Sequence, residues 1–144
     1  MRAIPAAVRP FARKMSERAL QENIISTAHL LGYWMHHQPD SRRSTRGLPD
    51  LVMVGKQGTD VEGRLIYIEC KTDRGTVTID QGLVIHWLLL AGAEAYVMRP
   101  RHWLAEVVAP ILRGDEGYRG QDAYDALHYY FPRRRNENVG TSRG

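Results

Sequence analysis

The fold of this chain is decided by residues 65–98, which read LIYIECKTDRGTVTIDQGLVIHWLLLAGAEAYVM. Residues 65–71 predict a strand that is buried, because its first four residues, 65–68, are apolar on both faces. A helix is predicted from Thr78 to about Ala91, because Thr78 can cap its first turn and a glycine follows its last. Residues 95–98 then predict another strand. A strand, a helix and a strand in this order predict a parallel, right-handed crossover.

The part of the chain before this crossover predicts one helix and two strands. Ser16 can cap a helix that continues to about Leu31, where Gly32 supplies a stop. Its apolar residues recur at helical spacing and are Leu20, Ile24, Ala28 and Leu31. Strands are predicted at 33–37 and 51–54, and the second forms a hairpin with the strand at 65–71. The predicted fold class is therefore α/β, with a mixed central sheet flanked by helices.

The chain is long enough for one packed domain of 144 residues and too short for two comfortable ones. After the crossover, helices are predicted at 101–112 and 122–130. We expect four segments: a basic extension at 1–14, a core at 15–100, C-terminal helices packing on it at 101–131, and a basic tail at 132–144.

Cysteine content and hydropathy restrict the class of protein. The single cysteine, Cys70, excludes an internal disulfide framework and a cysteine-rich zinc site. No run of about 18 apolar residues occurs, so we expect no membrane span. A reducing compartment is compatible with both observations, and we expect a cytoplasmic protein.

The positive charge of the chain lies at its ends. The net charge is +4 and the isoelectric point is about 9.5. Residues 1–14 carry +4 and residues 133–144 carry +3, which leaves −3 for the middle. Basic tails around a mildly acidic body suit a polyanionic partner, with the acids reserved for metal. Taken alone, the basic tails are explained equally well by a role in solubility.

Four residues bring metal-site chemistry to one end of the predicted hairpin. Asp50 precedes its first strand, and Glu69 and Lys71 are two residues apart in its second, so their side chains share a face. Asp50 and Glu69, with the main-chain carbonyl of Cys70, are hard oxygen ligands suited to Mg²⁺. Lys71 can orient or deprotonate the attacking water. Separately, Pro-Asp usually marks a turn and Glu-x-Lys a surface ion pair.

The surroundings of these residues resemble a known family. The stretches GLPDLVMV (47–54), LIYIECKTDRGTVTIDQ (65–81) and SERALQENIISTAHLLGYW (16–34) are similar to the VRR-NUC nucleases, a branch of the PD-(D/E)xK, restriction-endonuclease-like superfamily. The resemblance covers roughly residues 16–100. It is strongest where Glu-x-Lys is followed by a short basic turn and then Asp-Gln.

This resemblance implies a metal-dependent DNA endonuclease that uses Mg²⁺ or Mn²⁺ and often acts on branched, nicked or flap DNA. It implies a small phage or prokaryotic enzyme in repair, recombination or replication. Asp50, Glu69 and Lys71 match the motif positions, and Gln81 matches a glutamine that supports the site. Two alternatives stay open: a homodimer that resolves Holliday junctions, and an inactive nucleic-acid-binding module or partner subunit.

DNA contacts are expected from arginines near these positions. Arg42, Arg43 and Arg46 lie in the loop that leads to Asp50, and Arg74 lies in the turn after Lys71. Each could clamp a phosphate, although a solvated basic loop is as good a reading.

One acid of the first helix is expected to join the site. At about 100° per residue, Glu17 lies in the middle of the apolar stripe, and Glu22 lies on the side turned toward water. We therefore predict that Glu17 is catalytic, either as a further metal ligand or as a partner of Lys71.

A homodimer is also predicted, because cutting both strands requires two centres. Its interface is expected to use apolar residues after position 100, such as Trp103, Val107 and Leu127. Trp34, Trp87 and Trp103 are expected in a core or an interface rather than as platforms on which bases stack.

Overall fold

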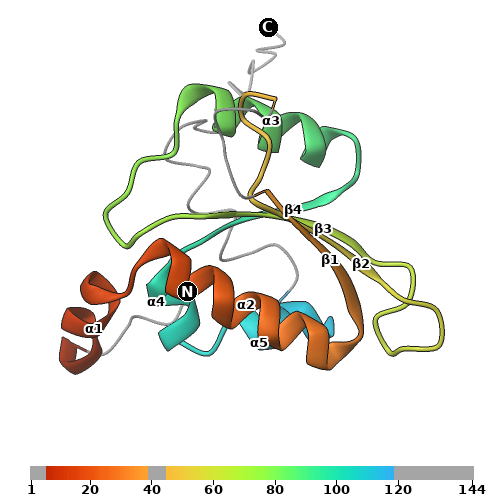
Figure 1. Cartoon of the computed structure of the whole chain (residues 1–144), viewed down its shortest axis with the longest axis horizontal. Coiled ribbons are helices and arrows are strands. Elements are labelled where there is room, and N and C mark those ends of the chain that lie inside the picture. Colours follow the sequence, from red (N-terminus) through yellow and green to blue (C-terminus); the bar gives the residue numbers. More distant parts are fainter. Residues whose placement is uncertain (1–5, 39–44, 119–144) are drawn as a thin grey trace, which may run out of the picture.

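A computed structural model describes residues 6–38 and 45–118 of the chain. Within these ranges it has a central sheet with helices on both sides (Figure 1). The elements in chain order are the 3₁₀ turn η1 (Ala6–Val8), α1 (Arg9–Lys14), α2 (Glu17–Leu31), β1 (Tyr33–His37), β2 (Leu51–Gly55), β3 (Leu65–Cys70), α3 (Ile79–Leu90), β4 (Glu94–Met98), α4 (Pro100–Leu104) and α5 (Val108–Arg113). The predicted fold class, a mixed sheet flanked by helices, is confirmed.

Helix α2 begins and ends where the local signals place it. The Ser16 side chain accepts a hydrogen bond from the Ala19 N–H, which satisfies one of the free donors of the first turn. Gly32 ends the helix with a φ of 100°, a left-handed conformation that glycine adopts without strain. A side chain at this position would also collide with Thr59 of the β2–β3 connection.

The sheet has the strand order β1-β2-β3-β4 and two kinds of pairing. β1 pairs antiparallel with β2, and β2 pairs antiparallel with β3. β3 and β4 are parallel and joined through α3, as the crossover in the sequence predicts. Because β2 begins at the end of the sheet where β3 finishes, the segments that carry Asp50 and Glu69 meet there.

The two faces of the sheet are covered unequally (Figure 1). Helices α1, α2, α4 and α5 lie on one face, where the larger core contains Leu20, Ile24, Met53, Ile66, Ile68 and Leu112 among others. Helix α3 alone lies on the other face, over a small core formed by Val77, Ile85, Ala95 and Val97. The site described below lies between the first turn of α2 and the first turn of α3.

One expectation about the C-terminal part of the chain is wrong in detail. Residues 101–112 do not form one helix, because the chain turns between α4 and α5, where Glu106 has a φ of 57°. Within the basic extension expected at 1–14, residues 9–14 form α1, which contacts α4 and buries Ala12. The helix predicted at 122–130 lies outside the described residues.

The expected dimer interface is wrong for one of its three residues, Val107. Val107 is buried within the larger core, and Trp103 packs against the same core from its edge. Leu127 lies beyond the part of the chain that the structure describes. None of the helices described is both long and apolar enough to span a bilayer.

Candidate metal and catalytic site

Glu69 is the centre of the candidate site because its carboxylate is almost completely buried. It lies near the end of β3 with 1% of its surface exposed. Its Oε1 accepts a hydrogen bond of 2.8 Å from Gln81 Nε2 and lies 3.5 Å from Lys71 Nζ. The Lys71 side chain is itself largely buried. A buried charge costs several kcal/mol unless it is paired, so Glu69 requires these neighbours.

Asp50 lies beside this pair at the start of β2. Its Oδ2 accepts a hydrogen bond of 2.9 Å from the main-chain N–H of Cys70, which holds the carboxylate against the end of β3. Antiparallel pairing of β2 with β3 makes the contact possible, since Leu51 pairs with Ile68 and Asp50 therefore faces the last residues of β3. The hairpin thus joins Asp50 and Glu69 across 19 positions of sequence.

Glu17 is the acid of α2 that approaches the site. It is half-buried in the first turn, and burial together with the charge of Asp50 raises its pKa, while Lys71 opposes the increase. Glu22, one turn further on, is exposed and forms a 3.1 Å ion pair with Arg18. The helix therefore directs Glu17, and not Glu22, toward the two other carboxylates, as its angular position on the helix indicates.

Three carboxylates share this end of the sheet with one lysine. Burial raises the pKa of Glu69 to about 8, with a further contribution from Asp50 and a smaller one from Glu17, and Lys71 offsets only part of the increase. Burial also raises the pKa of the Cys70 thiol, followed by the effects of Asp50 and Glu69. Negative charge in this low-dielectric region exceeds what Lys71 can neutralise.

Gln81 connects the site to the start of α3. Its side-chain Oε1 accepts a hydrogen bond of 3.0 Å from the Thr78 main-chain N–H. The main-chain N–H of Gln81 donates in turn to Thr78 Oγ1, and the two bonds form a capping box. The Nε2 atom of the same side chain donates to Glu69. The amide therefore does not face water, and it orients the buried carboxylate.

One atom of Glu69 fits a cation ligand. Oε2 is buried and has no hydrogen-bond partner among the described residues, and an unsatisfied buried carboxylate oxygen is costly. In the same ranges, no cluster of three histidine, cysteine or acidic side chains has the arrangement of a ready metal site. The predicted ligand set requires fewer side chains, since it uses two carboxylates and the Cys70 carbonyl. The free oxygen and the excess negative charge fit a divalent cation at that place.

The predicted DNA-binding arginines are only partly described. Arg42 and Arg43 lie outside the described residues. The side chain of Arg46 is 90% exposed, and its Nη1 lies 3.9 Å from Asp80 Oδ2 at the start of α3. Arg74 is exposed in the turn after Lys71. The two described arginines thus lie near the site with their guanidinium groups open to solvent.

Sequence reasoning missed two arginines, Arg99 and Arg101, that hold the turn after Lys71 in place. Arg99 Nη1 donates to the main-chain oxygens of Thr72 at 2.8 Å and Gly75 at 2.6 Å. Arg101 bonds to Asp73 through the side-chain and main-chain oxygens. A signal was present, because parallel strands finish at the same edge, so the basic residues after β4 must lie beside the residues after β3.

Comparisons with known proteins add no relative, since no family model, curated protein or solved structure matches the chain.

Proposed function

We propose that this chain is a metal-dependent DNA endonuclease with a restriction-endonuclease-like core of the VRR-NUC kind. The observation that carries the proposal is the environment of Glu69: a buried carboxylate with one free oxygen, beside Asp50, Glu17 and the Lys71 ammonium. A structural ion pair would need only one acid for one lysine. Three acids around a single lysine leave negative charge that a divalent cation would neutralise.

Asp50, Glu69 and the main-chain carbonyl of Cys70 would hold Mg²⁺ or Mn²⁺, with Glu17 as a further ligand, directly or through water. The cation would supply charge neutralisation at the phosphate and a lower pKa for a bound water. Asp50 is already positioned for this role by its hydrogen bond to the Cys70 N–H. Gln81 keeps Glu69 Oε1 occupied, so that Oε2 is the oxygen left for the ion.

Lys71 would act on the water and on the developing negative charge. Its Nζ lies 3.5 Å from Glu69 Oε1 and its side chain is 13% exposed, so the ammonium is held with little freedom. A fixed cation in a low-dielectric pocket stabilises the negative charge of a transition state more strongly than a cation in water does. The same group can orient the attacking water or accept its proton.

DNA is the substrate that the surrounding charges favour. Arg46 and Arg74 are exposed near the site, and the basic residues of both ends of the sequence add to the attraction for phosphate. Selectivity for branched, nicked or flap DNA, and action in the cytoplasm during repair, recombination or phage replication, are parts of the proposal that the resemblance in sequence supports.

The test is cleavage of labelled linear, nicked, flap and four-way DNA with Mg²⁺ or Mn²⁺ and with EDTA. We expect cleavage only with metal, and loss of cleavage in Asp50→Ala, Glu69→Gln and Lys71→Ala. DNA binding should change by no more than a few fold, because the arginines rather than the acids contact phosphate. Glu22→Gln is the matched control and should cut normally.

Full cleavage by Asp50→Ala in the presence of metal would contradict the assignment. Binding of DNA by the wild-type chain with no cleavage of any substrate would instead support the inactive binding module.

A further inference from the structure

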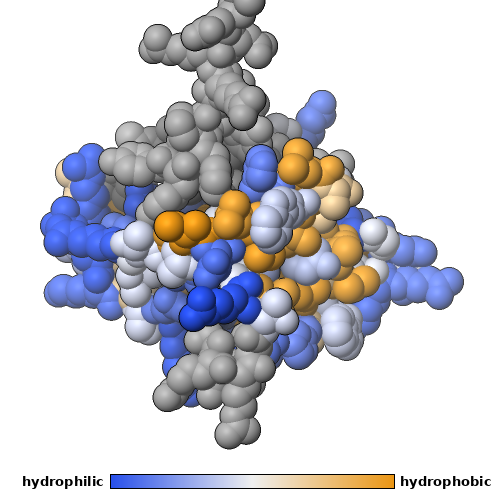
Figure 2. Space-filling model, turned by 90° about the horizontal axis from the view of Figure 1, so that it is seen from above, coloured by the Kyte–Doolittle hydropathy of each residue, from blue (hydrophilic) through white to orange (hydrophobic). Residues whose placement is uncertain are grey.

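The α3 side of the sheet has an exposed apolar area next to the candidate site. Two cross-strand rows form it. The outer row, Trp34, Val54 and Leu65, is exposed and apolar, whereas the inner row consists of the exposed His36 and the partly buried Val52 and Tyr67. In the outer row Trp34 is 54% exposed, Val54 36% and Leu65 41%. Figure 2, which looks onto this side, shows hydrophobic residues at the molecular surface.

This area is exposed because α3 covers only part of the sheet. Tyr67 of β3 packs with the small core formed by α3 and β4. Among the helices of residues 6–38 and 45–118, none lies over β1 and the outer part of β2 on this side (Figure 1). Their neighbours along the chain, Tyr33 and Met53, point to the opposite face and are completely buried.

The two rows lie on the same face as the catalytic groups. Leu65, Tyr67 and Glu69 alternate with Ile66 and Ile68, so the first three share one face of β3. From Leu65 to Glu69 is four residues along β3, or about 13 Å, and Trp34 lies two strands, or about 10 Å, to the side of Leu65. A strand of nucleic acid with one phosphate at the site could therefore reach the indole of Trp34 a few nucleotides away.

We infer that this face binds unpaired nucleotides beside the scissile phosphate, with a base stacked on Trp34. The inference rests on the proposed nuclease function and names its substrate class as DNA with a single-stranded segment. Bases of a duplex present only their edges in the grooves, whereas unpaired bases offer a face that an aromatic side chain can stack on. The exposed aromatic ring of Trp34 offers such a stacking surface.

Charged groups at both ends of the area suit a phosphate backbone. Lys56 follows β2, and its N–H donates to the Gly32 oxygen, which brings it beside the beginning of β1 and Trp34. Arg46 is exposed near Asp50 at the other end. The connection between β2 and β3 carries two exposed acids, Asp60 and Glu62, of which Glu62 accepts a hydrogen bond from the Gly58 N–H within the same loop. Apolar surface with a cation at each end is the combination found in grooves that bind single strands.

The experiment measures binding of the full chain, in EDTA, to a labelled 15-nucleotide oligothymidine and to a blunt duplex of equal length. Trp34→Ala should weaken binding to the single strand by at least about fivefold, the effect of losing one stacked base, and leave duplex binding within twofold. Trp34→Phe should keep most of the affinity. Trp34→Leu, which keeps apolar area without a ring, should behave as Trp34→Ala does and covers the case in which alanine destabilises the fold.

Trp87→Ala is the matched control, because Trp87 is 57% exposed on α3 and should leave both affinities unchanged. Equal single-strand binding by wild type, Trp34→Ala and Trp34→Leu would overturn the inference. So would a change from dimer to monomer by light scattering without an effect on binding, since the face would then be a protein interface.

The two proposals fail in different ways. The binding assay contains no metal, so loss of single-strand affinity in Trp34→Ala supports stacking even where no substrate is cut. Normal metal-dependent cleavage with unchanged binding by that variant would support the nuclease and overturn the stacking site.

Discussion

At the scale of single residues, Glu69 combines two properties that seldom occur together. It is buried, and one of its oxygens lacks a partner in the described part of the chain. Proteins retain such groups where a charge is needed more than stability. Burial raises the pKa of Glu69 to about 8, so the cost of ionising this carboxyl in the folded, metal-free protein can be measured through the pH dependence of stability.

We therefore predict an unusual pH dependence of stability. Folding raises the pKa of Glu69 from 4.5 to about 8, so its contribution is complete below pH 4.5 and is lost as the pH rises through 8. Glu69→Gln cannot lose a proton and should escape this loss. In EDTA, the thermal midpoints of wild type and Glu69→Gln should be similar at pH 5, and the variant should be several degrees higher at pH 9.

The control for this measurement is Glu22→Gln, whose carboxylate is exposed. Its midpoint should follow that of the wild type at every pH. Parallel curves for Glu69→Gln and wild type would show that the buried carboxylate does not titrate in this range.

The acids of α2 give a second test at this scale. Glu17→Gln should lower the cleavage rate at saturating DNA by at least about tenfold, the scale of one well-placed metal or water contact. Glu22→Gln should change the rate by less than about threefold. A rate that depends on Glu22 and not on Glu17 would assign the site to the other face of the helix.

At the scale of elements, the start of α3 combines a structural cap with a functional contact. Thr78 caps the first turn, and Gln81 in that turn bonds to both Thr78 and Glu69. Any movement of this turn therefore alters the hydrogen bond between Gln81 and the buried Glu69 carboxylate.

Thr78→Ala tests this coupling. Loss of the cap should reduce the free energy of unfolding by about 1 kcal/mol and reduce the cleavage rate several fold, because Gln81 is then less firmly held. Thr27→Ala is the control, since the Thr27 hydroxyl bonds only within α2, to the Asn23 oxygen. Urea unfolding and initial rates measure both effects, and a slower rate in Thr27→Ala would point to a general loss of structure.

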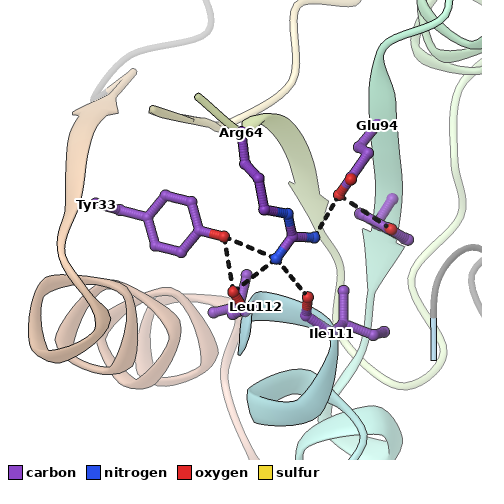
Figure 3. Close-up of polar contacts among 6 residues, drawn as sticks. Tyr33, Arg64, Glu94, Ile111 and Leu112 are labelled. Carbon is purple, nitrogen blue, oxygen red and sulfur yellow. Dashed lines mark hydrogen bonds and ion pairs between the residues drawn. The ribbon is translucent and has the colours of Figure 1, made fainter. Parts of the chain in front are cut away.

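At the scale of the whole molecule, Arg64 joins segments that are far apart in sequence (Figure 3). Its Nη1 donates to Tyr33 Oη at 3.0 Å and to the main-chain oxygens of Ile111 and Leu112 at 3.0 and 2.8 Å. Its Nη2 forms a 2.7 Å ion pair with Glu94. One side chain thus connects β1, β4 and the last turn of α5.

Arg64→Met should therefore cost about 3 kcal/mol of unfolding free energy, because it leaves Glu94 and the α5 carbonyls buried without this cation. Arg18→Met removes an exposed ion pair with Glu22 and should cost less than about 1 kcal/mol. Denaturant titration distinguishes these values. Equal losses in the two variants would mean that Arg64 contributes no more than a surface pair.

Local signals in the sequence determined the elements and the motif positions of the site. Ser16 and Thr78 cap helices at the predicted positions, because a cap depends only on hydrogen bonds within one turn. Asp50 and Glu69 could be expected to meet, since antiparallel pairing places the start of β2 opposite the end of β3. The angle of Glu17 on its helix followed from helical geometry alone.

Only the tertiary structure decided what lies around those positions. The exposure of Trp34 depends on how much of the sheet α3 covers, and the contacts of Arg64 depend on where α5 ends. The turn at Glu106 replaces a continuous helix because Val107 and Val108 pack into the core. Strand and helix periodicity specify which residues share a face of one element. Contacts between elements distant in sequence depend on how the whole chain packs, which local sequence patterns do not specify.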